Sequence, residues 1–137
     1  MTRITSFTRQ GLTFDVLDQG PEDGPVVLLL HGFPQDARGW DDVAARLNAQ
    51  GLRTLAMDQR GYSPGARPTE LAAYRREELS GDALALADEA GAERFHLVGH
   101  DWGGVLAWDI ALRAPERVTS LTVLSTPHLS LIHISEP

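Results

Sequence analysis

The sequence contains no cysteine and no lysine, and all 12 of its basic side chains are arginines. The absence of cysteine excludes disulfide bonds and thiol catalysis. The formal net charge is −7 and the arginines form no cluster, which argues against a nucleic-acid partner. We therefore expect neither a nucleic-acid interface nor a thiol-based site.

Long apolar segments are absent as well. No run approaches the roughly 20 residues that cross a bilayer, and residues 1–10 lack the apolar core of a signal peptide. The 137 residues are 42% hydrophobic, which is enough for the core of one globular domain. These features predict a soluble cytoplasmic protein without a membrane partner, and they leave the oligomeric state open.

The order of strands and helices predicts an α/β fold. Alternating or continuous apolar runs predict strands at residues 4–9, 12–18, 25–30, 53–57, 95–98 and 118–124. Helices are predicted at residues 41–50, 71–90 and 104–113. Strands that alternate with helices in this way indicate a mostly parallel, doubly wound sheet with right-handed crossovers.

In such a sheet, the loops at the carboxyl ends of the strands form the binding crevice. Three of these loops carry distinctive residues. They are His31-Gly32-Phe33-Pro34, the segment from Asp58 to Ser63, and Gly99-His100-Asp101-Trp102-Gly103.

The third loop places Asp101 between a strand and a helix, which is the setting of a nucleophile elbow. Gly99 and Gly103 allow the sharp turn that exposes the middle side chain at the sheet edge. A serine there would indicate attack on esters or amides, whereas a carboxylate indicates displacement at a saturated carbon. The alternative is that Asp101 only caps the N-terminus of the following helix.

Taken together, these motifs resemble those of α/β-hydrolase-fold enzymes of the epoxide hydrolase and haloalkane dehalogenase branch. The first loop is similar to the oxyanion loop of that family, and the third is similar to the aspartate form of its nucleophile elbow. The Asp58 loop resembles a segment that usually continues Gly-x-Gly-x-Ser, although here it reads Gly61-Tyr62-Ser63-Pro64-Gly65. The resemblance runs from about Phe7 to His128. It implies an α/β-hydrolase fold, truncated before the cap domain and the last strands.

The resemblance also implies a two-step mechanism. Asp101, ionised at neutral pH, would open an epoxide or displace a halide and become esterified to the substrate. Water would then hydrolyse the ester while backbone N–H groups of Phe33 and Trp102 bind the oxyanion. A histidine–carboxylate pair must activate this water, and only His128 and His133 follow the elbow. We therefore expect this chain alone not to turn over.

Residues around the nucleophile are expected to bind substrate or to support the loops. Phe33, Trp102 and His128 are predicted to line the substrate pocket, and an alternative role for Trp102 is to bind a halide through its indole N–H. The neighbours predicted to be structural are His31, Gly32, Pro34, Gly99, His100 and Gly103. His96 is interpreted as a core histidine, and Asp58 as a brace for its own loop. The sequence contains no cluster of metal ligands and no phosphate-binding loop. We therefore expect neither a metal nor an organic cofactor.

Among possible partners, a small-molecule epoxide or alkyl halide fits these residues. Phe33 favours an epoxide, because many haloalkane dehalogenases similar to this chain carry asparagine at that position. Haloalkane dehalogenase is the alternative within the branch. A non-catalytic ligand-binding module of the same fold is the alternative from another class.

The last nine residues differ in composition from the rest. Residues 129–137 hold two of the four isoleucines in the chain, and their string resembles the translation of a sequencing adapter. We therefore interpret residues 1–128 as the N-terminal part of an α/β-hydrolase domain and residues 129–137 as a non-native tail.

Overall fold

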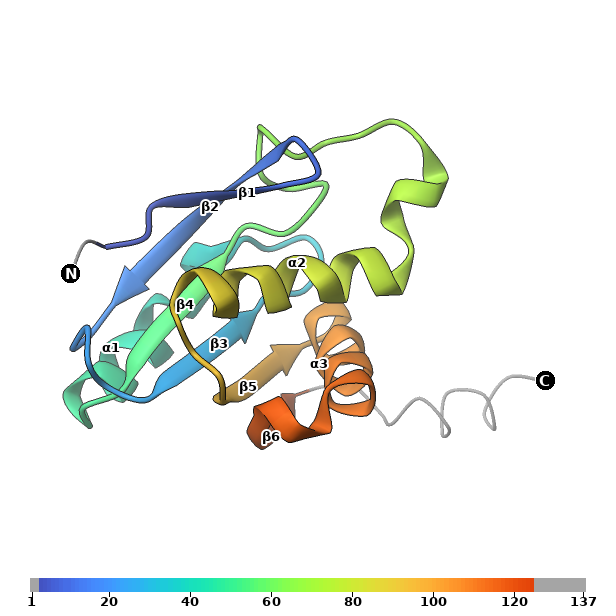
Figure 1. The fold of residues 1–137 in the computed structure, drawn as a ribbon. Coiled ribbons are helices and arrows are strands. Elements are labelled where there is room, and N and C mark those ends of the chain that lie inside the picture. Colours follow the sequence, from blue (N-terminus) through green and yellow to red (C-terminus); the bar gives the residue numbers. More distant parts are fainter. Residues whose placement is uncertain (1–2, 125–137) are drawn as a thin grey trace.

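The computed structural model describes residues 3–124, which form a six-stranded sheet with helices on both faces (Figure 1). The strands are β1 (Ser6–Arg9), β2 (Leu12–Gln19), β3 (Val26–Leu30), β4 (Arg53–Met57), β5 (Phe95–His100) and β6 (Val118–Leu124). Their order across the sheet is β1-β2-β4-β3-β5-β6. The pairs β1–β2 and β2–β4 are antiparallel, and the pairs from β4 to β6 are parallel. The prediction of a mostly parallel, doubly wound sheet is confirmed.

Three α-helices and three short 3-10 helices connect the strands. They are η1 (Ala37–Trp40), α1 (Asp41–Ala49), η2 (Leu71–Tyr74), α2 (Arg76–Glu89), α3 (Trp102–Arg113) and η3 (Pro115–Arg117). In Figure 1, α2 and α3 lie together across one face of the sheet, and α1 lies behind it on the other. Between residues 3 and 124, no helix has both the length and the apolarity needed to cross a membrane.

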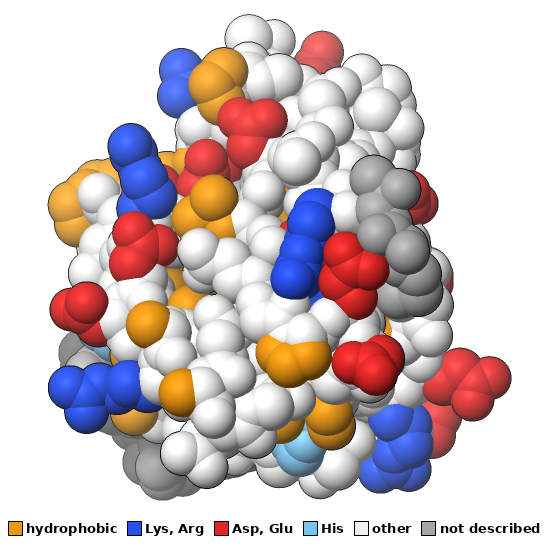
Figure 2. Space-filling view, turned by 90° about the vertical axis from the view of Figure 1, so that its left-hand side faces the viewer, with side chains coloured by type: hydrophobic (Ala, Val, Ile, Leu, Met, Phe, Trp, Pro, Cys, Tyr) orange, Lys and Arg blue, Asp and Glu red, His pale blue; other side chains and the backbone are white. Residues whose placement is uncertain are grey.

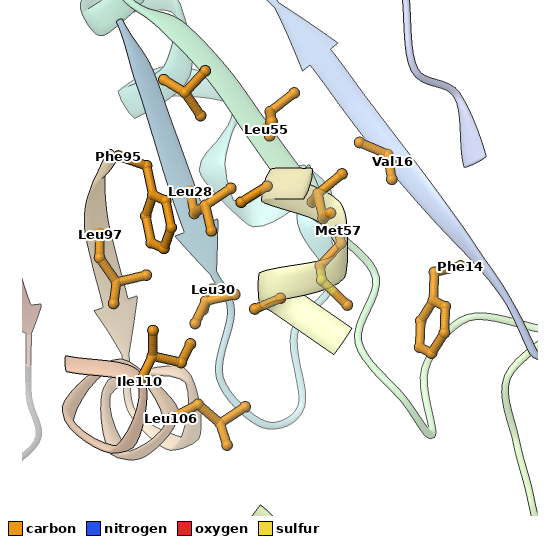
Figure 3. Close-up of a cluster of buried hydrophobic side chains, with 14 of the residues drawn as sticks. Phe14, Val16, Leu28, Leu30, Leu55, Met57, Phe95, Leu97, Leu106 and Ile110 are labelled. Carbon is orange, nitrogen blue, oxygen red and sulfur yellow. The ribbon is translucent and has the colours of Figure 1, made fainter. Parts of the chain in front are cut away.

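The core consists of two hydrophobic clusters, one on each face of the sheet. All five residues of β3 are buried, as expected for a central parallel strand covered on both faces. The larger cluster lies between the sheet and the helices α2 and α3, and Figure 3 shows Leu28, Leu97 and Ile110 within it. The smaller cluster includes Trp40 and Ala44, which pack from η1 and α1 against the opposite face.

The prediction of one continuous helix over residues 71–90 was wrong. The structure has η2 and α2 instead, separated by the extended backbone of Arg75 (φ −65°, ψ 148°). The Ala73 carbonyl, which a continuous helix would pair with the N–H of Glu77, accepts a hydrogen bond from Arg60 Nη1 at 2.7 Å. A side chain from a distant loop therefore takes up the acceptor that the helix would need.

The interpretation of His96 as a core residue was also wrong. His96 is only half-buried, and its Nδ1 lies 2.6 Å from Ser120 Oγ on the neighbouring strand. Alternate residues of β5, beginning with Phe95 and Leu97, are buried beneath α3, whereas His96 points to the opposite face. Because α1 packs mainly against β4, that face of β5 receives less cover.

A buried cluster of charged side chains ties the loop after β4 to α2. Arg60 donates two hydrogen bonds to the Asp82 carboxylate, from Nε to Oδ2 at 2.9 Å and from Nη2 to Oδ1 at 2.7 Å. Arg9 of β1 donates to the same carboxylate at 2.9 Å. The side chains of Arg60 and Asp82 are each only 1% exposed, so this pair is screened little by solvent.

A second buried ion pair lies where β2 meets β4. Arg53 Nη2 donates to Asp18 Oδ2 at 2.6 Å, and both side chains are almost fully buried. Burial alone would raise the pKa of Asp18, but hydrogen bonds from Arg53, the Ile4 N–H and Arg3 outweigh it and hold that pKa below the usual value. The stabilisation from this shift is present above the ordinary aspartate pKa and is lost as the pH falls through the lowered value.

On the surface, charges of the two signs are mixed. Figure 2 shows one face of the molecule, on which arginine side chains are interspersed with acidic ones and hydrophobic side chains are scattered. No basic patch is visible on this face.

The Asp82 cluster leads to a prediction about stability. We expect Asp82→Asn to lower the free energy of unfolding by about 3 kcal/mol, because it leaves the buried Arg60 guanidinium without a counter-charge. Asp23→Asn, at an exposed loop position, is the matched control and is expected to change stability by less than about 0.5 kcal/mol. Urea denaturation of both variants measures the difference, and equal midpoints would refute the expectation.

Candidate active site

Asp101 lies in the sharp turn between β5 and α3, with φ 56° and ψ −120°. This left-handed conformation is strained for a residue with a Cβ atom and costs on the order of 1–3 kcal/mol. The surrounding backbone is packed so closely that only glycine fits. A Cβ atom on Gly99 would collide with the Gly103 carbonyl, and one on Gly103 would collide with the Leu30 carbonyl. The fold therefore imposes the strained turn on Asp101.

The carboxylate of Asp101 faces the first loop. Its Oδ2 accepts a hydrogen bond from the Phe33 N–H at 3.2 Å. Although Asp101 occupies the N-cap position of α3, its side chain makes no capping hydrogen bond to that helix. The geometry thus gives no support to the alternative in which Asp101 serves only as a helix cap.

Gly32 allows the first loop to approach Asp101 closely. A Cβ atom on Gly32 would lie 2.5 Å from the Asp101 Cβ and 2.9 Å from the His100 carbonyl oxygen. The Gly32 carbonyl accepts from the Gln35 N–H at 2.8 Å and closes a tight turn, within which the Phe33–Pro34 peptide bond is cis. Gly32 and Pro34 therefore shape the backbone that presents the Phe33 N–H to the carboxylate.

A cavity of about 470 Å³ opens beside this arrangement. Phe33 and Trp102, both predicted to line a pocket, lie on its wall and are 66% and 63% exposed. Its other lining residues, which the sequence analysis did not name as pocket residues, are Gln59, Arg60, Gly61, Tyr62, Tyr74, Arg76, Leu79, Val105 and Leu106. Four of these, Gln59 to Tyr62, belong to the Asp58 loop, which had been placed at the correct edge of the sheet. The predicted position of this loop was the sequence signal that could have identified Gln59 to Tyr62 as pocket residues.

Tyr62 is the residue of the Asp58 loop on which the charge of Asp101 acts. Burial and the negative charge of Asp101 together raise the pKa of its phenol, so Tyr62 stays protonated. Its ring packs edge-on against the ring of His31, with 4.6 Å between the centroids. A neutral phenol therefore stands on the wall of the cavity within the electrostatic influence of the Asp101 carboxylate.

The histidines predicted to be structural lie away from this cavity. His31 is 2% exposed, and burial lowers its pKa, which keeps the imidazole neutral at neutral pH. The Nδ1 of His100 lies 3.1 Å from Gln35 Oε1. Both histidines line a separate cavity of about 210 Å³ together with Gln35, Trp40 and Leu124. His128, predicted to line the pocket, lies outside the described residues.

Asp58 has the bracing contacts that the sequence suggested. Its Oδ1 accepts from the Ala37 N–H at 2.8 Å, and its carbonyl accepts from the Ser63 hydroxyl at 2.6 Å. It therefore connects the loop after β4 to η1. Among residues 3–124, no group of three or more potential ligands is arranged to hold a metal ion.

The comparison with known families agrees with this geometry. Residues 25–137 match the sequence pattern of the α/β hydrolase fold. The chain belongs to the α/β-hydrolase fold family. Its β5–α3 turn, with Asp101 at the apex, is the strand–turn–helix segment in which such enzymes carry their nucleophile.

Relatives of this α/β-hydrolase chain include proteins named as epoxide hydrolases. It is 41% identical to epoxide hydrolase A of Mycobacterium tuberculosis over 119 residues, which cover 87% of this chain and 37% of that protein. It is 39% identical to the AB hydrolase superfamily protein YfhM of Bacillus subtilis over 118 residues, which cover 86% of this chain and 41% of that protein.

Among solved structures, the fold is similar to that of epoxide hydrolase A from Mycobacterium thermoresistibile. The TM-score is 0.85 at 36% identity, covering 89% of this chain and 38% of that one. An epoxide hydrolase from Vigna radiata also has a TM-score of 0.85, at 35% identity and with 90% and 40% coverage. The chain thus spans about two fifths of the length of these four proteins.

The strained turn predicts a difference between two substitutions at one position. Asp101→Gly and Asp101→Ala both remove the carboxylate, but only glycine removes the Cβ atom that makes a φ of 56° unfavourable. We expect the glycine variant to be more stable than the alanine variant by about 1 kcal/mol. Thermal or urea unfolding of the two variants tests this, and an alanine variant of equal or greater stability would contradict it.

Proposed function

We propose that this chain is the N-terminal part of an epoxide hydrolase in which Asp101 is the nucleophile. The observation that carries the proposal is the position of the Asp101 carboxylate, which accepts the Phe33 N–H beside a cavity instead of capping α3. The similarity to proteins named epoxide hydrolases supports the choice of substrate.

In the first step, a carboxylate oxygen of Asp101 attacks a saturated carbon of the epoxide ring. A new C–O bond forms, the ring C–O bond breaks, and the released oxygen takes up a proton from water. The product is an ester between Asp101 and the substrate. Because a carboxylate is already ionised, this attack needs no base to remove a proton from the nucleophile.

In the second step, water gives up a proton to a base and attacks the carbonyl carbon of the Asp101 ester. The acyl C–O bond then breaks, which releases the diol and restores the Asp101 carboxylate. The negative charge develops on an oxygen of Asp101 itself, so the donors must surround the nucleophile. The Phe33 N–H, 3.2 Å from Oδ2, is one such donor, and the Trp102 N–H at the start of α3 is the second. Each is worth about 3 kcal/mol of transition-state stabilisation in comparable sites.

The base that activates this water is assigned to sequence beyond residue 128. Of the histidines in the described part of the chain, His31 is buried, His96 pairs with Ser120 and His100 contacts Gln35. None of the three lines the large cavity. We accordingly treat residues 1–128 as part of a larger catalytic domain and residues 129–137 as foreign to it, so the 137-residue chain alone is expected to give no turnover.

Haloalkane dehalogenase is the second candidate, because the exposed Trp102 on the cavity wall could hold a halide through its indole N–H. The Phe33 side chain has no hydrogen-bond donor that could bind the halide together with Trp102. This absence favours an epoxide as the substrate.

The proposed mechanism predicts where a solvent oxygen atom goes in a single turnover. With the complete enzyme in excess over an aryl epoxide in ¹⁸O-water, we expect an unlabelled diol and ¹⁸O in the peptide that contains Asp101. Attack of water on the ester carbonyl accounts for both results. Mass spectrometry of the diol and of the digested enzyme measures the label.

Two variants serve as controls for this experiment. Asp101→Asn is expected to abolish diol formation, and Asp42→Asn, at an exposed position on α1, is expected to leave both rate and labelling unchanged. Label in the diol after the first turnover would disprove the covalent mechanism. Release of halide from a haloalkane without hydrolysis of epoxides would favour the dehalogenase.

A further inference from the structure

His31, the residue that begins the oxyanion loop, is held at two points by Gln59. The Gln59 backbone N–H donates to His31 Nε2 at 3.1 Å, and the Gln59 side-chain Nε2 donates to the His31 carbonyl oxygen at 2.7 Å. Both residues are almost fully buried, at 2% and 6% exposure. Hydrogen bonds this deep in the protein are little disturbed by solvent.

This arrangement determines which nitrogen of His31 carries the proton. Because Nε2 accepts a hydrogen bond, it is unprotonated, and the proton of the neutral ring resides on Nδ1. Nδ1 lies 3.0 Å from the Gly32 carbonyl oxygen and donates to it. The imidazole therefore connects the loop after β4 to Gly32, and the next residue, Phe33, donates its N–H to Asp101.

Gln59 is itself fixed by its neighbour in sequence. Arg60 binds Asp82 of α2 through two hydrogen bonds and donates a third to the Ala73 carbonyl. A continuous series of short contacts thus leads from α2 through Arg60 and Gln59 to His31, and from there to the oxyanion loop. The contacts between Arg60 and Asp82 and between Gln59 and His31 join groups with little freedom to move, because both pairs are buried.

We propose that Gln59 and His31 are positioning residues, which hold the Phe33 N–H in place against the Asp101 carboxylate. The proposal rests on the function proposed above, since it assigns these residues to the oxyanion loop of that mechanism. Neither side chain reaches the reacting atoms. They act through the backbone of Gly32 and Phe33, and a displacement of that backbone weakens the donor on which ester hydrolysis depends.

The positioning requires a neutral His31. If Nε2 carried a proton, its N–H would point at the Gln59 N–H. The two donors would repel each other, and the hydrogen bond between the ring and the loop would be lost. Burial opposes that protonation, while the negative charges of Asp58 and Asp36 favour it. Other titratable groups near the ring are Tyr62, in edge-on contact with it, His100, on the same small cavity, and Asp101, across Gly32. Arg60 follows Gln59 on the loop after β4, where it is paired with Asp82.

Matched glutamine substitutions in the complete enzyme test the proposal. Gln59→Met keeps the side-chain length and removes the donor to the His31 carbonyl. Gln50→Met makes the same exchange at an exposed position after α1 and is the control. Gln59→Glu is the second variant, in case the methionine variant folds poorly. It keeps the shape, removes the donor and adds a negative charge near His31.

The first readout is kinetic. Single-turnover experiments with an aryl epoxide separate formation of the Asp101 ester from its hydrolysis. Both Gln59 variants are expected to slow hydrolysis about tenfold, which is a fraction of the hundredfold or greater loss seen when an oxyanion donor is removed altogether. KM is expected to change less than the hydrolysis rate, because Gln59 is almost fully buried and contributes little of the cavity wall. Gln50→Met is expected to match the unmodified enzyme.

The second readout follows His31 directly, in enzyme labelled with ¹⁵N-histidine. Long-range ¹H–¹⁵N spectra distinguish a protonated ring nitrogen from an unprotonated one. We expect the proton on Nδ1 at neutral pH and a titration midpoint below the usual histidine value, which Gln59→Glu moves upward. A residue with only a packing role would leave this midpoint unchanged.

The outcomes separate the two proposals. If the unmodified enzyme opens no epoxide, the proposed function fails, while the spectra still decide whether Gln59 controls His31. A proton on Nε2 at neutral pH would overturn the inference. So would hydrolysis rates in both Gln59 variants within about twofold of the Gln50→Met control.

Discussion

The site depends on the close approach of three backbone segments at one point. The end of β3, the end of β5 and the start of α3 meet around Asp101, where Gly32, Gly99 and Gly103 leave no room for side chains. This contact sets the left-handed turn of Asp101 and brings the Phe33 N–H to its carboxylate. The large cavity and its wall follow from it, because the same segments carry Phe33 and Trp102 to that edge of the sheet.

Two buried arginines join other segments of the fold. Arg60 joins the loop after β4 to α2, and Arg53 joins β4 to β2, each through paired hydrogen bonds to one carboxylate. A guanidinium group suits this role, because its planar fork matches the two oxygens of a carboxylate and stays charged when buried. A buried ion pair of this kind adds little net stability by itself, but it fixes which segments lie together.

Much of the architecture could be predicted because it depends on local pattern. The apolar run of β3 and the glycines around Asp101 were sufficient to predict a central strand and an elbow. The break before α2 could not be predicted, since it arises when Arg60 takes the Ala73 carbonyl from 13 residues away. The orientation of His96 depends on how far α1 extends over the sheet. The contacts of Gln59 with His31, 28 residues apart, likewise exist only in three dimensions.

The exclusive use of arginine also bears on the reactivity of the proposed substrate. Epoxides alkylate thiols and amines, and aspartyl esters are cleaved by nearby amines. No cysteine or lysine side chain occurs in these 137 residues, so neither side reaction has a partner among the side chains here. The described histidines are buried or half-buried, which limits their own reaction with an electrophile. This part of an enzyme of the proposed kind would therefore offer neither a thiol nor a lysine amine to the epoxide or to the Asp101 ester.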